Sequence, residues 1–198
     1  MWHSLFPPIR NHNAPTFAMW TDLLNQGCRI PASSGRDWHN SKPNDDPAAA
    51  SFLGIDEELA AVDMEQAAVD AIRKGRVSLS MGPLLLCSIQ ISGETYGLGQ
   101  TVPVSGKELS GSASVIIELD SNVRKGSWTM PKQTLRVELV SNKGVIGECS
   151  LSADDTAISC LIDTKGLLWL RAQLYGTFHE CSTMIAFTNP VYFGKFTE

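Results

Sequence analysis

Residues 84–91 read Leu84-Leu85-Leu86-Cys87-Ser88-Ile89-Gln90-Ile91, and the turn pair Ser92-Gly93 follows directly. From about residue 82 onward the chain shows this strand-like period of two and no helical pattern. Turn residues such as Asn142-Lys143-Gly144 separate further candidate strands. The predicted strands are Leu84–Ile91, Ser114–Leu119, Thr134–Val140, Val145–Ser150, Ile158–Ile162, Leu167–Tyr175 and Met184–Phe187. Short strands with frequent turns predict an antiparallel, immunoglobulin-like β-sandwich over residues 81–198.

The first 80 residues follow a different pattern, in which helical and strand-like stretches alternate. Thr16 to Gln26 predicts a helix followed by a glycine stop, and Cys28–Ala32 predicts a strand. A second helix begins at the N-cap Asp63, with a glutamine three residues later as a capping box, and Val69 and Ile72 mark its buried side. A helix, a strand and a helix cannot close a barrel. We therefore expect residues 1–80 to be the incomplete end of an α/β unit, and the fold class to be α+β.

Composition restricts the class of partner. The chain has 198 residues, 43% of them hydrophobic, which is enough for one or two domains with a real core. The net charge is −5 and no Lys/Arg cluster stands out, so nucleic acid and anionic membranes are poor candidate partners. No apolar run approaches the roughly 20 residues that span a bilayer. Residues 1–8 lack the features of a signal peptide, so we expect a cytoplasmic location.

Cysteine usage argues against a disulfide scaffold. The five cysteines are Cys28, Cys87, Cys149, Cys160 and Cys181. Their number is odd and no C-x-x-C pair occurs, which favours buried thiols in a reducing compartment over a zinc ribbon. One disulfide stays open, because Cys149 and Cys160 could face each other across a hairpin.

The segment Gly35-Arg36-Asp37-Trp38-His39 follows the predicted strand Cys28–Ala32. In α/β barrels the residues just past a strand's C-terminal end lie at the mouth, where catalysis takes place. An Asp-x-His pair in that position can direct a carboxylate and an imidazole toward one cation site or two adjacent ones. Two ligands alone do not hold a catalytic metal, which usually needs three from the protein. In a loop, such an Asp is more often a capping or turn residue.

Five motifs occur in a recognisable order along the chain. They are Trp20–Gly27, Gly35–His39, Arg73–Arg76, Gly82–Leu85 and Ala186–Tyr192. Together they resemble the C-terminal part of a PHP-domain metallohydrolase of the CehA/McbA-like group, which carries an appended β-sandwich. The chain departs from that pattern at Arg36, where a small residue is usual; this places a cation beside the proposed metal site.

The resemblance implies a metal-dependent hydrolase of phosphate or carboxylic esters. In that family, residues at the positions of Asp37 and His39 help to bind neighbouring divalent ions, here Zn, Mn or Fe. Such ions polarise the ester and lower the pKa of a bound water. The other ligands, including a His-x-His pair, would precede Met1, so no catalytic residue is assigned and we expect the chain alone to be inactive. Its expected partners are the missing barrel half or a second copy of the chain, with a small ester substrate once complete.

A non-catalytic binding or assembly module, for a glycan or a protein partner, is the rival interpretation. Trp128 lies on a polar loop and is the candidate surface contact, whereas Trp20 and Trp169 fall on core-facing phases. His12 is a weaker candidate for lining the pocket of the Asp-x-His motif. The sequence contains no G-x-S-x-G elbow, phosphate-binding loop or H-E-x-x-H motif.

The truncated-barrel interpretation has a structural consequence. The helix Thr16–Gln26 should expose an apolar patch made of Phe17, Trp20, Leu23 and Leu24. We therefore expect residues 1–60 to be less ordered than residues 82–195, or to be covered by another chain.

Overall fold

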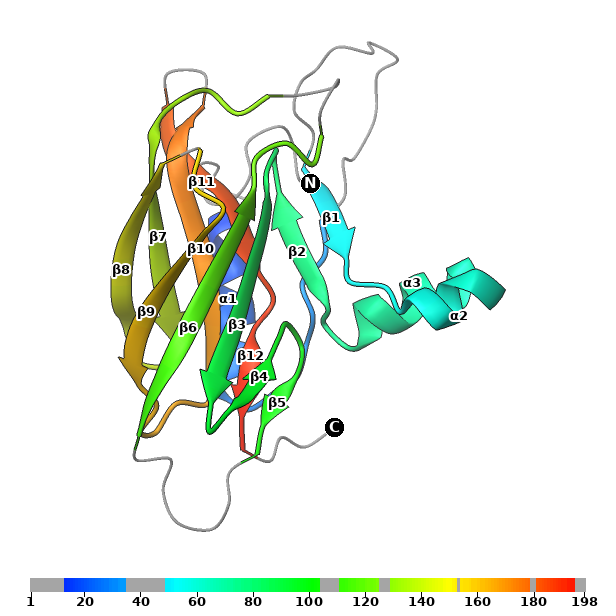
Figure 1. Cartoon of the computed structure of the whole chain (residues 1–198). Coiled ribbons are helices and arrows are strands. Elements are labelled where there is room, and N and C mark those ends of the chain that lie inside the picture. The colour runs from blue at the N-terminus through cyan, green and yellow to red at the C-terminus, as the bar shows by residue number, and fades with distance from the viewer. Residues whose placement is uncertain are drawn as a thin grey trace.

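The structure is a computed structural model that describes residues 13–34, 49–103, 111–124, 129–152, 154–178 and 181–194. Its helices are α1 (Asn13–Asn25), α2 (Glu57–Val62) and α3 (Met64–Arg73). Its strands are β1 (Ala50–Leu53), β2 (Val77–Ser80), β3 (Leu84–Ile91), β4 (Glu94–Tyr96), β5 (Thr101–Val102), β6 (Ser112–Asp120), β7 (Thr134–Ser141), β8 (Gly144–Ser152), β9 (Ala157–Asp163), β10 (Trp169–Phe178), β11 (Cys181–Thr188) and β12 (Val191–Phe193). The strands form two sheets that face each other, as Figure 1 shows.

The two sheets confirm the predicted antiparallel sandwich. The larger sheet runs β1-β2-β11-β10-β12-β5, and β7 joins it by pairing with β10 and carries β8 on its other side. The smaller sheet runs β4-β3-β6-β9. Among the described strands every pairing is antiparallel except that of β12 with β5. All seven predicted strands are present, with bounds that differ from the prediction by at most three residues.

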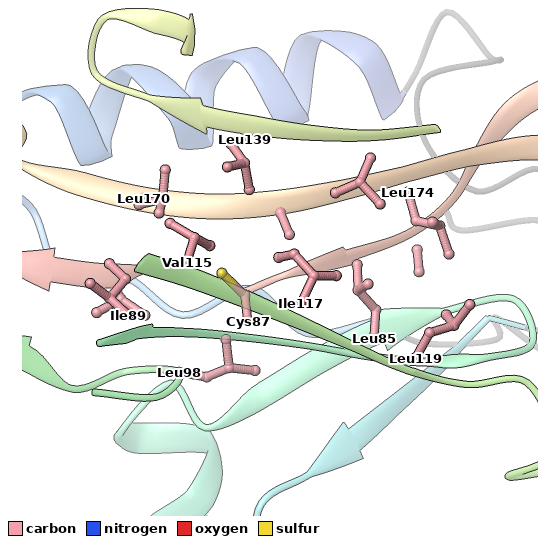
Figure 2. Packing of buried hydrophobic residues seen from close by; sticks show 14 of the residues in the cluster. Leu85, Cys87, Ile89, Leu98, Val115, Ile117, Leu119, Leu139, Leu170 and Leu174 are labelled. Carbon is pink, nitrogen blue, oxygen red and sulfur yellow. The ribbon is translucent and has the colours of Figure 1, made fainter. Parts of the chain in front are cut away.

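The main core lies between the two sheets. On β3 the buried side chains alternate with more exposed ones, so Leu85, Cys87 and Ile89 face the larger sheet. Cys87 lies opposite Ile117 of β6 in the register. Figure 2 shows these residues directed toward leucines of β7 and β10 across the gap between the sheets. Each fully buried aliphatic side chain stabilises the fold by about 1.5–3 kcal/mol relative to exposure, before entropy is counted.

A second core lies on the opposite face of the larger sheet, where α1 packs. Trp20 and Leu24 of α1 contact Trp169 and Phe187 of the sheet, and the rings of Trp20 and Phe187 are 5.7 Å apart. In Figure 2 the helix lies on the side of the sheet away from the labelled core residues. The prediction of an exposed apolar patch is therefore wrong, because Trp20 and Leu24 are buried against the chain's own sandwich.

Arg171 of β10 is buried beneath α1 in a box of aromatic rings. Its guanidinium carbon lies 4.4 Å from the centre of the Phe17 ring and 4.7 Å from that of Trp20. Its Nη2 donates to Thr21 Oγ1 at 3.0 Å. Burial lowers the pKa of Arg171 from its ordinary value, and the π faces compensate part of the lost hydration. This cation therefore links α1 to the sheet by polar as well as apolar contacts.

The predicted strand Cys28–Ala32 is wrong. Residues 28–34 form no regular secondary structure and join no ladder of either sheet. Instead, the Asn189 side chain bonds the backbone of Ala32 twice: the Ala32 amide donates to Asn189 Oδ1 at 2.7 Å, and Asn189 Nδ2 donates to the Ala32 carbonyl at 2.9 Å. The Asn189 side chain thus makes the backbone hydrogen bonds at Ala32 that a neighbouring strand would make in a sheet.

The described part of residues 49–80 does not form a separate α/β unit. Strands β1 and β2 pair antiparallel at the edge of the larger sheet, and Ser78 to Ser80 of β2 pair with β11. These residues therefore share a sheet with residues 81–194. The expected incomplete barrel is not observed in the described residues.

Helices α2 and α3 lie between β1 and β2 in the chain and project from the sandwich (Figure 1). The predicted N-cap of α3 is confirmed, since the Gln66 backbone amide donates to the Asp63 carboxylate at 2.9 Å. The reciprocal half of the predicted capping box is not formed, because the Gln66 side chain donates to Asp70 at 3.2 Å instead. The predicted buried side is wrong. Val69 and Ile72 are each 39% exposed, whereas the helix buries Ala67 and Ala71. Small side chains allow the helix to approach its neighbours closely.

Candidate functional site

The residues predicted to bind metal, Asp37 and His39, lie outside the described residues, as do Arg36 and Trp38. The same holds for His12 and for Trp128. Within the described ranges, no three His, Cys, Asp or Glu side chains come together as a possible metal site. The metal site and its Zn, Mn or Fe ion therefore stay a prediction, and we derive no reaction step from them.

The described residues instead contain a cleft beside β3. It has a volume of about 410 Å³. Its lining includes Phe52, Arg76, Ser78, Leu84, Leu86 and Leu98. The cleft exists because β4 pairs only with Ile89–Ile91, at the end of β3. Along Leu84–Ser88, one edge of β3 pairs with β6 and no described strand pairs with the other.

Two polar atoms of the cleft lining are buried without a hydrogen-bond partner. Ser78 is 1% exposed, and its Oγ makes no hydrogen bond. Arg76 Nε is likewise buried and unpaired. A buried polar group left unpaired costs about 1–3 kcal/mol, and native structures contain few of them. Both atoms belong to residues that line the same cleft, which makes this lining the place where the described residues leave polar groups to be satisfied.

The Arg76 side chain also lines a second hollow of about 560 Å³, which joins the cleft at Arg76 and Gln100. Arg29 and Lys74 line this hollow too, and we call Arg29, Lys74 and Arg76 the basic rim. Lys74 Nζ pairs with the Asp70 carboxylate at 3.1 Å on the solvent side. No carboxylate among the described residues pairs with either arginine of the rim. In a chain of net charge −5 this is a local concentration of positive charge.

The loop from Gly97 to Gln100 forms the wall between the cleft and the second hollow. The Gly97 amide donates to Gln100 Oε1 at 2.7 Å, and the Gly99 amide donates to the Pro190 carbonyl at 2.8 Å. Arg29 donates to the Gly99 carbonyl and stacks over the Tyr192 ring at 4.7 Å. These contacts hold Arg29 and the loop in one place, so the rim is a built feature of the fold.

Cys149 and Cys160 do meet, but not across a hairpin of one sheet. Cys149 lies on β8 of the larger sheet and Cys160 on β9 of the smaller one, and both pack against the main core. Both are free thiols, as are Cys28 and Cys87. Burial is the largest of the effects that raise the pKa of Cys149 to about 12, and a hydrogen bond with Cys160 is the second. In this structure Cys149 and Cys160 are therefore two free thiols and form no disulfide.

The buried thiol and phenol groups predict that the fold loses stability at alkaline pH. Burial raises the pKa of Cys87, Tyr175 and Tyr192 to about 12 in each case. Their ordinary values are 9 for the thiol and 10 for the phenols. Since the folded pKa values are the higher ones, this stabilisation is complete below pH 9 and is lost as the pH rises toward 12. We expect the thermal midpoint to fall by about 10 °C between pH 8.5 and pH 11. Calorimetry checks this, and Tyr175→Phe should lessen the fall; a constant midpoint would contradict it.

Comparison with known proteins gives no match: no family model matches the chain, and neither a curated protein nor a solved structure matches it. The resemblance to PHP-domain hydrolases thus has no support beyond the motifs themselves. In the part of the chain that the structure describes, the helices are too short or too polar to cross a membrane.

The cleft was not predicted from the sequence. Arg76 ends the motif Arg73–Arg76, and nothing in that motif indicates a cleft. Its partners come from residues 52, 78, 84, 86 and 98, which lie on different strands and loops. Ser78 is a small polar residue within a strand that is buried at every position, and the sequence alone does not reveal that burial.

Proposed function

We propose that this chain is a non-catalytic module that binds a small, largely apolar ligand in the cleft beside β3. The observation that carries the proposal is the pair of buried, unpaired polar atoms, Ser78 Oγ and Arg76 Nε, in one apolar cavity. Ligand sites are typically concave, mostly apolar and about 300–1,000 Å³ in volume, with a few convergent polar groups. The cleft has each of these properties.

The test uses 1-octanol as a neutral probe, followed by nuclear magnetic resonance of the labelled chain. We expect shifts confined to residues around Leu84, Leu86 and Leu98, with a Kd of about 1 mM or tighter. Leu86→Trp should fill the cleft and abolish binding. Leu161→Trp is the matched control, because Leu161 is 79% exposed on β9 of the same sheet. Octanol binding that survives Leu86→Trp would contradict the proposal, as would the absence of binding to the parent chain.

The metal-dependent hydrolase stays a second hypothesis, motivated by the order of the five motifs and untested by the described residues. It is measured separately with p-nitrophenyl phosphate and p-nitrophenyl acetate in the presence of Mn²⁺ or Zn²⁺. Turnover that Asp37→Ala abolishes would establish catalysis and overturn the non-catalytic proposal.

A further inference from the structure

We infer that the ligand of the cleft is an amphipathic carboxylate, with its apolar tail beside β3 and its head group on Arg76. This inference rests on the proposed function and adds the chemical class of the ligand. It follows from the way in which the apolar cleft and the basic rim meet at one side chain.

The tail end of the site is apolar. Phe52 from β1, Leu84 and Leu86 from β3, and Leu98 from the following loop line it. Leu98 is buried, whereas Leu86 remains 36% exposed and marks the entrance. An alkyl chain or an aromatic ring entering here would remove exposed apolar surface of the protein from water, at about 25 cal/mol per Å².

The head-group end is positively charged. Arg76 lines both the cleft and the second hollow, so this residue stands where the apolar lining meets the basic rim. Its Nε has no partner in the protein, which leaves one N–H of the planar fork to be satisfied. A carboxylate matches the guanidinium fork with two parallel hydrogen bonds, a geometry that alcohols and ammonium groups cannot reproduce. The Ser78 hydroxyl, also unpaired, can donate a further hydrogen bond within the cleft.

The charges around the head group favour an anion. Arg29 and Lys74 lie on the same rim as Arg76. Among the described residues, two carboxylates bond to side chains that line the second hollow: Asp70 pairs with Lys74, and Glu94 accepts a hydrogen bond from the Tyr96 hydroxyl. Neither pairs with Arg76 or Arg29, so the arginine charges are not neutralised by the described part of the protein.

The backbone of Arg76 is held independently of its side chain. Its amide donates to the Ala71 carbonyl at 2.9 Å, and its carbonyl accepts from the Gly54 amide at 2.8 Å. A substitution at this position therefore keeps the connection between α3 and β2, and a change in ligand affinity reports on the guanidinium. Arg73, on the exposed side of α3, supplies a matched control for the loss of one nearby positive charge.

The test compares octanoate, 1-octanol, octylammonium and octyl phosphate on the full chain by calorimetric and NMR titration at pH 7.5. We expect octanoate to bind at least about tenfold more tightly than 1-octanol, and octylammonium to bind more weakly than both. Arg76→Met should abolish the tenfold preference for octanoate and leave 1-octanol affinity within about twofold. Arg76→Lys should restore part of the preference, because it keeps the charge without the fork. Arg73→Met should leave both affinities within about twofold.

Each outcome has a separate meaning. Equal binding of octanoate and 1-octanol, both lost in Leu86→Trp, would overturn this inference and leave the proposed function standing. No binding of any probe would overturn both. Loss of both affinities together in Arg76→Met would show that Arg76 only shapes the cleft, and would overturn the inference. Tighter binding of octyl phosphate than of octanoate would overturn the carboxylate assignment in favour of a phosphate ester.

Discussion

Replacing Leu24 with alanine is expected to lower the free energy of unfolding by about 3 kcal/mol. Leu24 is fully buried between α1 and the outer face of the larger sheet, where it packs near Trp20 and Phe187. Truncation leaves a cavity that the rigid aromatic neighbours cannot fill. The matched control is Met19→Ala on the same helix, since Met19 is 58% exposed and its loss should change stability by less than about 0.5 kcal/mol. Urea denaturation of both variants measures the difference.

This experiment also decides between the observed packing and the truncated-barrel expectation. If α1 belongs to the sandwich, its amides should exchange slowly in a monomer, and Leu24→Ala should accelerate their exchange together with that of β10 and β11. A negligible effect of Leu24→Ala, combined with fast exchange in α1, would show that the helix does not dock and would revive the expectation that residues 1–60 need another chain.

Replacing Gly99 with alanine is expected to lower the free energy of unfolding by about 3 kcal/mol. Gly99 has φ +74°, and a Cβ at this position would lie 1.8 Å from the Lys74 carbonyl oxygen. The obstacle is backbone, so no rotamer change relieves it. The Gly93→Ala variant is the control, because Gly93 has φ +84° but nothing within 4 Å of the added carbon. It should lose only about 1 kcal/mol, the cost of the left-handed conformation.

The same substitution tests how the basic rim is built. Displacing Gly99 from Lys74 should move the loop that separates the two hollows, so octanoate affinity should fall in Gly99→Ala and not in Gly93→Ala. Chemical denaturation gives the stability, and the titration described above gives the affinity. Equal losses of stability in the two glycine variants would mean that the loop and the end of α3 are not in contact.

The sequence predicted the strands of the sandwich well where one face of a strand is buried and the other is not. In β3, Leu85, Cys87 and Ile89 alternate with more exposed residues, and this indicates both the two-residue period of a strand and which of its faces is buried. The cap of α3 was equally readable, since Asp63 and Gln66 act within four residues of each other. Such features depend on local chemistry, which a single sequence contains.

The strands that were missed lack this local signal. In β2 the residues from Val77 to Ser80 alternate between apolar and polar, with Val77 and Leu79 packed against α1, but all four are buried and the run is too short to predict a strand. β1, β4, β5 and β12 have only two to four residues each, too few to show a period. The prediction of a strand at residues 28–32 failed for the reverse reason, because the segment has apolar residues but joins no sheet, and its Ala32 backbone bonds the Asn189 side chain instead.

The predicted and the observed sites depend on different kinds of information. Asp37 and His39 were found because they are two residues apart, and their role stays a prediction since they lie outside the described residues. Arg76 and Ser78 are also two residues apart, yet nothing local distinguishes them. Their importance comes from Phe52, Leu86 and Leu98, which the fold brings to the same cleft.

By itself the sequence determined the antiparallel strands, their turns and the capped helix, because hydrophobic period, turn residues and capping act between residues close in the chain. Only the tertiary structure decided that α1 covers the outer face of a sheet, that β1 and β2 extend that sheet, and that a half-buried arginine and a buried serine line one cleft with residues of β3. These features depend on which surfaces meet after distant segments pack. That choice minimises the exposed apolar area of the whole chain, and no short window of residues contains it.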